Sequence, residues 1–226
     1  MAARAVPFGL FLCFILIAQL FEWFGRAYGW DPSSVGRFEV WLYPLKTVVV
    51  GAALAYYWPQ YDELGWPPRF SGQSILVTVG AGFLVYLAWV RMDWPWAMQG
   101  GQSAGYRPFG VPGSSGAFLA IVRLMGAAIV VPVMEELFWR SFLMRYLISS
   151  RFEVVRLGTF TPLSFICVVL LFGVEHDLWL AGMMAGVVYG LLLLWSRNLW
   201  VCVGAHAVTN FSLGIHVLVT NEWYWW

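Results

Sequence analysis

Seven long apolar runs divide the chain of 226 residues and restrict the folds that it can adopt. A helix that spans the hydrocarbon core of a bilayer needs about 20 mostly apolar residues. The predicted spans are 7–24, 41–58, 74–90, 117–148, 162–174, 179–195 and 199–219. Only 11% of the residues are charged, whereas charged residues make up about 25% of a soluble domain. The sequence therefore predicts an all-α, polytopic transmembrane helix bundle with about seven to eight spans.

No internal repeat or composition shift marks a domain boundary, so residues 1–226 are expected to form a single integral membrane domain. Residues 1–116 supply the amino-terminal spans and a loop, and residues 117–219 carry the polar motifs described below. The segment from Arg91 to Gly116 is rich in Gly, Pro, Ser and Gln, which is typical of an extramembrane loop. It could be a lid over a site or a plain connector.

Charge limits the partners and suggests an orientation. The formal net charge is +1 and the basic residues form no stripe, so no nucleic acid is expected as a partner. Basic residues favour cytoplasmic loops. With the amino terminus inside, the inner side holds Arg4, Arg69, Arg145, Arg151, Arg156 and Arg197, against Arg26, Arg37, Arg91 and Arg107 outside. We expect a multi-pass protein of the plasma (inner) membrane, in contact with membrane lipids, with a cytoplasmic amino terminus.

Three polar clusters interrupt the apolar runs of the carboxy-terminal half. Ionisable groups at membrane depth are rare unless they have a function. Residues four positions apart lie on one face of a helix, because four steps advance the helix by about 400°. The clusters are Glu135 and Glu136 with Arg140, Phe172 with His176, and His206 with Asn210. The spacing predicts that three helices bring these side chains into one pocket.

The span 117–148 is too long for a single straight crossing. Its 32 residues make about 48 Å of helix, against a hydrocarbon core of about 30 Å. Pro132 is the expected break, because proline lacks an N–H and clashes with the preceding turn. If a new helix starts there, Glu135 and Glu136 lie in about its first turn, where the helix dipole favours negative charge.

The two adjacent glutamates are expected to have different roles, because neighbouring helical residues point about 100° apart. Glu136 faces Arg140 one turn later, and an ion pair would satisfy both charges. Glu135 is then free to act as a general base. A purely structural salt bridge accounts for Glu136 and Arg140 but leaves Glu135 unexplained.

His176 follows an apolar run, with Glu175 and Asp177 beside it. Taken alone it could be an interfacial histidine, but with a second histidine nearby it becomes a candidate water activator or metal ligand. Glu175 and Asp177 are interpreted as solvated residues at the end of a helix.

His206 and Asn210 lie in the middle of the last span, where both side chains need partners. Together they could direct two donors to one point and stabilise an oxyanion, or they could form an interhelical polar clasp. His216 is interpreted as a packing or interfacial residue. The series Gly182, Gly186 and Gly190 indicates close helix packing.

The three motifs, EExxxR, FxxxH and HxxxN, in this order within membrane spans, resemble those of the CPBP (Abi) family. Its members are intramembrane proteases related to the CAAX prenyl endopeptidases and to bacteriocin-processing or immunity proteins. The longer string VPVMEELFWRSFLMRYL resembles the CAAX-protease-related branch found beside exosortase and PEP-CTERM sorting systems. The resemblance covers residues 117–219 and implies that this part is a CPBP-like catalytic core.

The resemblance implies a role for each motif residue. Glu135 would activate water with help from His176, and Glu136 would pair with Arg140 to hold the site. Phe172 would pack the pocket wall. His206 and Asn210 would stabilise the oxyanion. Such proteases are interpreted either as glutamate-dependent enzymes with no obligatory cofactor or as metalloproteases that use a divalent metal such as zinc. The sequence has no HExxH motif.

The expected function is hydrolysis of a peptide bond in a membrane-anchored or lipid-associated substrate by a CAAX-type intramembrane endopeptidase. One alternative is a non-catalytic membrane scaffold or an immunity-type protein that keeps the motifs for stability. A transporter would also bury Glu, Arg and His, but it is expected to show paired repeats, and the two halves of this chain show none.

Overall fold

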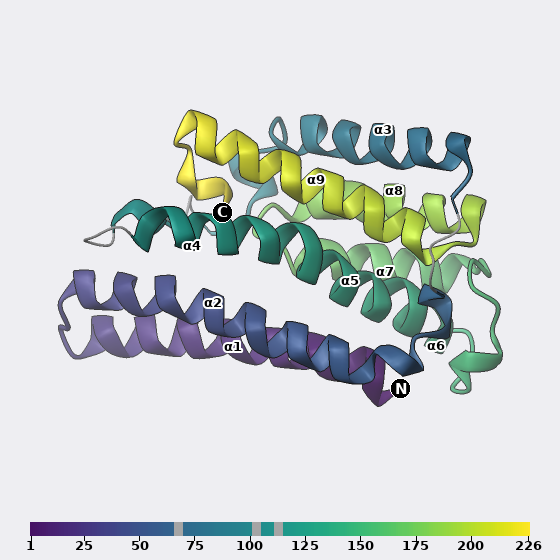
Figure 1. The fold of residues 1–226 in the computed structure, drawn as a ribbon, viewed down its shortest axis with the longest axis horizontal. Coiled ribbons are helices and arrows are strands. Elements are labelled where there is room, and N and C mark those ends of the chain that lie inside the picture. Colours follow the sequence, from purple (N-terminus) through teal and green to yellow (C-terminus); the bar gives the residue numbers. More distant parts are fainter. Residues whose placement is uncertain (66–69, 101–104, 111–114) are drawn as a thin grey trace.

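The computed structural model describes residues 1–65, 70–100, 105–110 and 115–226, and within these residues every regular element is helical (Figure 1). This confirms the predicted all-α class. The separate helices are α1 (Ala2–Ala27), α2 (Pro32–Tyr57), α3 (Gly72–Trp89), α7 (Pro162–Val174), α8 (Trp179–Ser196) and α9 (Leu199–Thr220). One continuous helical stretch joins α4 (Ser115–Met125), a π-helical segment Gly126–Val130, α5 (Val131–Glu136), a second π-helical segment Leu137–Leu143, and α6 (Met144–Tyr146).

Six helical stretches in the described residues are long and apolar enough to cross a membrane: α1, α2, α3, the stretch from α4 to α6, α8 and α9. The seventh predicted span is the shorter helix α7, which has 13 residues. That length covers about 20 Å, less than a hydrocarbon core of about 30 Å. The connection after α7, with Glu175 and His176, therefore starts at membrane depth.

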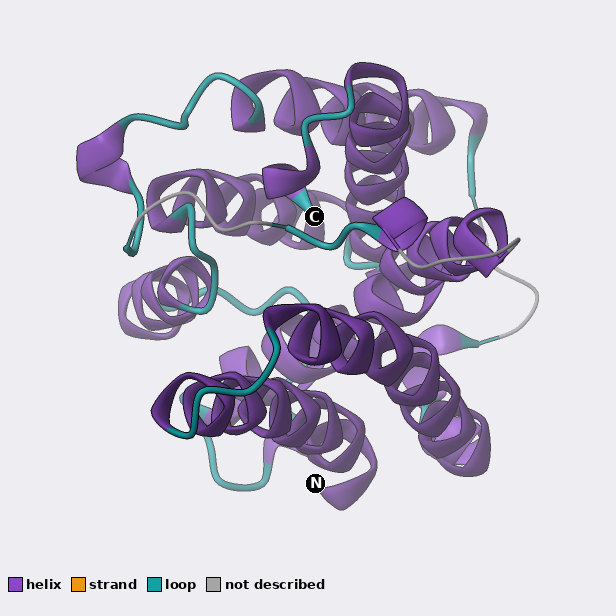
Figure 2. Cartoon of the chain, turned by 90° about the vertical axis from the view of Figure 1, so that its left-hand side faces the viewer, coloured by secondary structure: helices purple, strands orange, loops and turns teal. Residues whose placement is uncertain are grey.

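The stretch from α4 to α6 lies at the centre of the bundle. The antiparallel pair α1 and α2 packs along one side of it, and α9 packs along the other, with α3 beyond α9 (Figures 1 and 2). Helices α7 and α8 pack against each other, and α8 also contacts α9. This arrangement places the polar residues of α5, the end of α7 and the middle of α9 in the interior.

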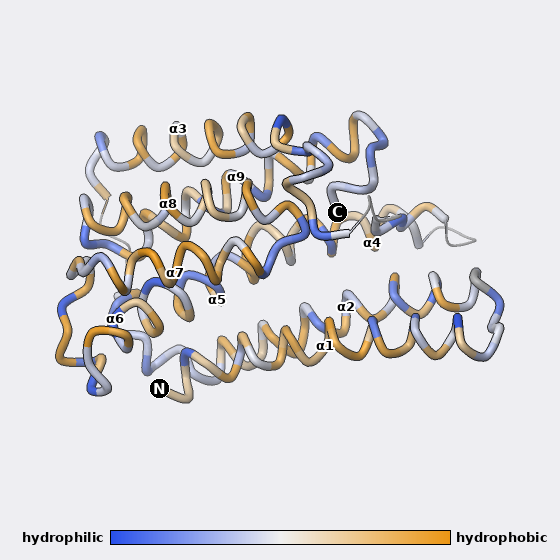
Figure 3. The backbone as a smooth tube through the Cα atoms, turned by 180° about the vertical axis from the view of Figure 1, so that it is seen from behind, coloured by the Kyte–Doolittle hydropathy of each residue, from blue (hydrophilic) through white to orange (hydrophobic). Residues whose placement is uncertain are grey.

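Many large apolar side chains are exposed, and hydrophobic residues predominate along α1 and α7, where the backbone tube of Figure 3 is mostly orange. Leu16, Val48, Leu76, Leu84 and Leu163 are each more than half exposed in the isolated chain. Exposed leucines on helices of this length are suited to contact with lipid acyl chains. The protein is a multi-pass membrane protein.

The sequence predicted a break at Pro132, but the helix continues through this residue. Instead, the π-helical segment Gly126–Val130 widens the turn before the proline, and the N–H of Val131 donates to the carbonyl of Gly126. A π-helical turn accommodates one residue more than an α-helical turn. Because the helix continues, Glu135 and Glu136 do not lie at a free helix amino terminus, and the predicted contribution of the helix dipole is absent.

The glycine series of α8 lies against α7, as predicted. A Cβ atom at Gly182 would be 3.0 Å from the Cα of Gly173, and one at Gly190 would be 2.7 Å from the ring of Phe165. The absence of side chains allows the two helices to approach closely. The short helix α7 is thereby held beside α8 along its length.

Parts of the predicted loop from Arg91 to Gly116, residues 101–104 and 111–114, lie outside the described residues. In the described part, the side chain of Gln99 donates to the carbonyls of Val174 at 2.7 Å and His176 at 3.1 Å. The backbone N–H of Gln99 donates to the carbonyl of Asp177 at 2.7 Å. The loop thus holds the connection that carries His176.

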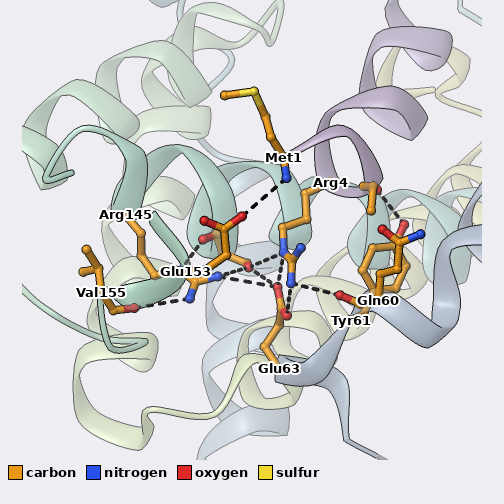
Figure 4. A network of polar contacts seen from close by, with 10 residues as sticks. Met1, Arg4, Gln60, Tyr61, Glu63, Arg145, Glu153 and Val155 are labelled. Atoms are coloured by element: carbon orange, nitrogen blue, oxygen red, sulfur yellow. Dashed lines mark hydrogen bonds and ion pairs between the residues drawn. The ribbon is translucent and has the colours of Figure 1, made fainter. Parts of the chain in front are cut away.

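A second set of charged residues joins the amino-terminal region to the central stretch (Figure 4). Arg4 of α1 contacts both carboxylate oxygens of Glu63, at 2.7 and 2.6 Å, and Ser141 also donates to Glu63. Arg145 lies 3.7 Å from the same carboxylate and donates to the Ser141 hydroxyl at 2.7 Å. These four residues, named here the amino-terminal ionic cluster, fasten α1 and the turn Asp62–Leu64 to the central stretch.

Glu63 lies in the connection between α2 and α3, outside the spans, and is 6% exposed in its side chain. Burial alone would raise the pKa of its carboxyl group. The hydrogen bonds from Arg4 and Ser141, and the charge of Arg4, outweigh burial and hold the pKa below its usual range.

Candidate active site

A cavity of about 410 Å³ opens inside the bundle between α1, the central stretch, the end of α7, α8 and α9. Five of the seven predicted site residues line it: Glu135, Phe172, His176, His206 and Asn210. Glu136 and Arg140 lie behind the wall and are fully buried. The structure therefore brings together the residues that the three motifs predicted, in two layers.

Glu135 is the carboxylate of the cavity wall. It is 4% exposed, and its Oε2 atom lies 4.0 Å from Nε2 of His206. None of the described residues forms a hydrogen bond with this oxygen. A buried carboxylate oxygen without a protein partner is costly, which makes Glu135 a candidate for contact with water or substrate.

Glu136 holds two neighbouring groups in the layer behind the wall. Its Oε1 atom lies 3.1 Å from Nη1 of Arg140, the predicted ion pair, and 3.0 Å from Nδ1 of His206. A carboxylate accepts hydrogen bonds, so Nδ1 of His206 donates and its Nε2 faces Glu135. Glu135, Glu136, Arg140 and His206 are named here the cavity cluster.

Aromatic rings enclose the cavity cluster. The guanidinium group of Arg140 lies 4.2 Å from the centre of the Phe172 ring, an arrangement suited to a cation–π interaction. The Tyr189 ring stacks on the His206 imidazole at 5.0 Å, and its hydroxyl donates to Thr209 at 2.8 Å. Phe172 is thus both a wall of the cavity and a support for Arg140.

The orientation of the His176 ring is set by a hydrogen bond to the last turn of α7. Its Nδ1 atom lies 2.7 Å from the carbonyl oxygen of Phe172. A carbonyl can only accept a hydrogen bond, so Nδ1 carries the proton and Nε2 of the neutral ring is an acceptor. The Trp89 ring of α3 packs edge-on against the imidazole at 5.4 Å. The two histidines therefore differ, because one is held by a carboxylate and the other by a carbonyl group.

Asn210 is held by the irregular turn before Pro132. In this π-helical turn the N–H of Val131 bonds to Gly126, and Pro132 has no N–H to offer. The carbonyl of Ala127 is left without a helical donor, and the side-chain amide of Asn210 donates to it at 2.9 Å. One amide hydrogen of Asn210 is thereby committed, and the second remains for the cavity, which Asn210 lines.

Sequence reasoning missed three residues of the site. The interpretation of Glu175 as a solvated end residue is wrong, because it lines the cavity and accepts a hydrogen bond from Trp139 at 3.1 Å. The shortness of the run 162–174 was the available signal, since a helix of that length ends at membrane depth. Trp139 and Tyr189 carry no spacing signal that separates them from other core aromatics.

His216 lies apart from the cavity wall and has its own partners. Its Nδ1 lies 3.0 Å from the Tyr86 hydroxyl and its Nε2 lies 3.2 Å from Glu222. These contacts fit the packing role expected for it.

The two histidines of the cavity each keep one ring nitrogen for a further partner. Nδ1 of His176 and Nδ1 of His206 are engaged with protein oxygens, and Nε2 of each ring is left. Among the described residues, no group of three or more His, Cys, Asp and Glu side chains is arranged to hold a metal ion.

Residues 117–212 match the family model described as Type II CAAX prenyl endopeptidase Rce1-like. The predicted resemblance to the CPBP family is confirmed. The match begins in α4 and ends in α9, so it contains all seven motif residues and covers less than half of the chain. No curated protein and no solved structure matches the chain. The match to the Rce1-like family supports a CAAX-type membrane protease in general terms.

Proposed function

We propose that the protein is an intramembrane endopeptidase that hydrolyses a peptide bond of a membrane-anchored or lipid-associated substrate within the cavity. The observation that carries this proposal is the convergence of Glu135, His176 and His206 on one cavity, with a Glu135 oxygen that lacks a protein partner. A volume of about 410 Å³ has room for water and a short peptide segment.

In the proposed reaction, His176 and Glu135 orient a water molecule. The Nε2 lone pair of His176 accepts one hydrogen bond from this water, and Glu135 removes a proton as its oxygen bonds to the carbonyl carbon of the substrate. The tetrahedral oxyanion then accepts hydrogen bonds. The C–N bond breaks, and protonated Glu135 returns the proton to the leaving amine. The products are a carboxylic acid, which keeps the second hydrogen of the water, and an amine, and transfer of that hydrogen to the amine gives the carboxylate and the ammonium group.

The oxyanion has two proposed donors, the free amide hydrogen of Asn210 and Nε2 of His206. Because Nδ1–H of His206 is committed to Glu136, its Nε2 donates only in the imidazolium form. The carboxylates of Glu135 and Glu136 lie 4.0 Å from Nε2 and 3.0 Å from Nδ1 of this ring. Arg140 in turn balances Glu136. Glu136 and Arg140 are positioning residues in this scheme.

The proposed orientation places the amino terminus in the cytoplasm. Arg145, Arg151, Arg156 and Arg197 lie in or next to the connections at the end of the bundle that holds the amino terminus (Figure 1). Basic residues of short loops favour the cytoplasmic side.

The test is cleavage of a peptide with one transmembrane segment by the purified protein in phospholipid nanodiscs, followed by mass spectrometry. The wild-type protein should release defined products, and the Glu135→Gln and His176→Gln variants should release them at about 10²–10⁴-fold lower rates. Equal cleavage by wild type and Glu135→Gln would contradict the proposal. Complete absence of cleavage by the wild type on a panel of anchored peptides would favour a non-catalytic scaffold.

A further inference from the structure

Two cations next to the cavity form no ion pair within the part of the chain that the structure describes. Arg123 of α4 lines the cavity, and Lys46 of α2 lies beside it. Both contact the ring of Tyr43, with Nζ of Lys46 at 4.8 Å and the guanidinium carbon of Arg123 at 4.3 Å from its centre. Among the described residues, no carboxylate forms an ion pair with either cation.

Aromatic contacts alone do not satisfy Arg123. Besides Tyr43, the rings of Tyr106 and Trp226 lie 5.4 and 6.0 Å from its guanidinium carbon. Its Nε atom is buried and forms no hydrogen bond with the described residues. Rings attract a cation through their faces, but they accept no strong hydrogen bond from a guanidinium group in its plane. The in-plane donors of Arg123 are suited to an anion.

Lys46 adds to the need for an anion. It contacts the Phe11 ring at 4.0 Å, and its charge lies close enough to Arg123 for repulsion and to Glu135 for a longer-range attraction. Charged residues within membrane spans normally pair with an opposite charge or face a water-filled cavity. Arg123 and Lys46 place two positive charges at this end of the cavity, and neither forms an ion pair with a carboxylate of the described residues.

The spacing between Arg123 and the cavity cluster is that of a short extended peptide. Arg123 and Glu135 lie 12 positions apart on one continuous helical stretch. That separation is about 18 Å along the axis, which an extended chain covers in about five residues. A substrate segment in the cavity can therefore reach both residues at once.

We propose that Arg123, supported by Lys46, is a specificity-determining residue that binds a carboxylate group of the substrate about five residues from the bond that is cleaved. This inference rests on the proposed function, because the bound peptide is taken to be the substrate. The binding itself does not require cleavage. The guanidinium group can form two parallel hydrogen bonds with a carboxylate, which favours Arg123 over Lys46 as the direct ligand. The carboxylate is either the end of a peptide chain or an Asp or Glu side chain.

The test measures binding to the Glu135→Gln protein in phosphatidylcholine nanodiscs. The probes are fluorescent peptides with one transmembrane segment and an uncharged tail, which ends in a free carboxylate, in an amide, or in an amide preceded by Asp. We expect at least one carboxylate peptide to bind about tenfold more tightly than the uncharged amide. A gain limited to the free terminus or to Asp identifies the source of the carboxylate.

Variants test whether Arg123 causes the preference for carboxylate peptides. Arg123→Gln should remove the preference, and Arg123→Lys should keep part of it, because the charge remains while the paired hydrogen bonds are lost. The matched control is Arg151→Gln, which removes an exposed cation outside the spans and should leave the preference unchanged. Thermal unfolding of each variant identifies those that fail to fold, and Lys46→Met then tests the same end of the cavity through a second residue.

Equal binding of all three peptides by the folded Glu135→Gln protein would overturn the inference. So would a preference that survives Arg123→Gln. Nanodiscs that contain phosphatidylglycerol test a lipid phosphate as the ligand, and loss of the preference in them would overturn the assignment to a substrate carboxylate. Cleavage by the wild type is measured separately, so a lack of turnover with a clear binding preference would contradict only the proposed function.

Discussion

The central helical stretch contributes residues to two buried ionic clusters. The clusters differ in how many of their polar atoms form hydrogen bonds. In the amino-terminal ionic cluster, both oxygens of Glu63 accept hydrogen bonds from Arg4 (Figure 4). In the cavity cluster, one oxygen each of Glu135 and Glu136 and the guanidinium nitrogens of Arg140 form no hydrogen bond with the described residues. Arg140 and Ser141 are adjacent, yet they belong to different clusters.

This difference separates a structural set of charges from a candidate catalytic one. A completely paired set of buried groups stabilises a fixed arrangement, because each desolvated group keeps its hydrogen bonds. A set with unused acceptors and donors retains a cost that water or substrate can relieve. The amino-terminal region, which lies outside the family match, thus contributes an anchor for the helix that carries the site.

The largest expected effect is on the cavity side. Glu135→Gln should lower the cleavage rate about 10²–10⁴-fold, because a glutamine cannot accept the proton. Its thermal stability should stay equal to or exceed that of the wild type, since a carboxylate oxygen without a partner is removed. The exposed pair Glu22 and Arg26 offers the control, Glu22→Gln, which should change neither quantity. A large loss of stability in Glu135→Gln would erase the distinction between the clusters.

The amino-terminal ionic cluster should show the reverse pattern. Glu63→Gln leaves Arg4 and Arg145 without their carboxylate, and breaking a buried pair in this way costs about 3–5 kcal/mol. Denaturation in detergent micelles measures the free energy of unfolding, and the cleavage rate of the folded fraction should stay near that of the wild type. Unchanged stability would show that the network contributes nothing as an anchor.

The stabilisation by Glu63 should also depend on pH. Its carboxyl has a lowered pKa in the folded protein, so its contribution is complete above the unfolded pKa of about 4.3. The contribution is lost as the pH falls through the lower folded value. The difference in stability between wild type and Glu63→Gln should therefore be constant near neutral pH and shrink in acid. A difference that grows as the pH falls would contradict the assigned direction.

A change at Asn210 should alter both stability and the cleavage rate, because its side chain bonds to the π-helical turn and also lines the cavity. Asn210→Ala removes the donor to Ala127, with a cost of about 1–3 kcal/mol, and removes a proposed oxyanion donor, with a rate loss of about 10²–10³-fold. Asn210→Gln keeps the amide but displaces it. A loss of stability with a normal rate would limit Asn210 to its contact with the π-helical turn.

The smallest expected effect is that of the aromatic support. Tyr189→Phe removes the hydroxyl that donates to Thr209 but keeps the ring on His206. We expect a loss of about 1 kcal/mol in stability and a cleavage rate within a few-fold of the wild type. A rate loss as large as that of Glu135→Gln would place the Tyr189 hydroxyl in the chemistry.

Local periodicity predicted the helices and the pairs that lie one turn apart. Residue spacing predicted the ion pair of Glu136 with Arg140. Spacing and apolar content together predicted that the three motif segments pack in one bundle. The sequence did not predict how Pro132 is accommodated, since a π-helical turn depends on packing and on the donor that Asn210 provides from α9. The contacts of Glu63 and Glu175 also depend on distant partners, Arg4 and Trp139, which no local pattern identifies.

The central claim is that substrate lies in the cavity with its reacting bond between Glu135, His176 and the oxyanion donors. An experimental structure of the Glu135→Gln protein with an uncleaved membrane-anchored peptide tests it most directly. We predict that the carbonyl oxygen of one peptide bond lies within hydrogen-bond distance of Asn210 and His206, with its carbon facing residue 135. A peptide bound elsewhere on the bundle, with the cavity filled by side chains or lipid, would contradict the account.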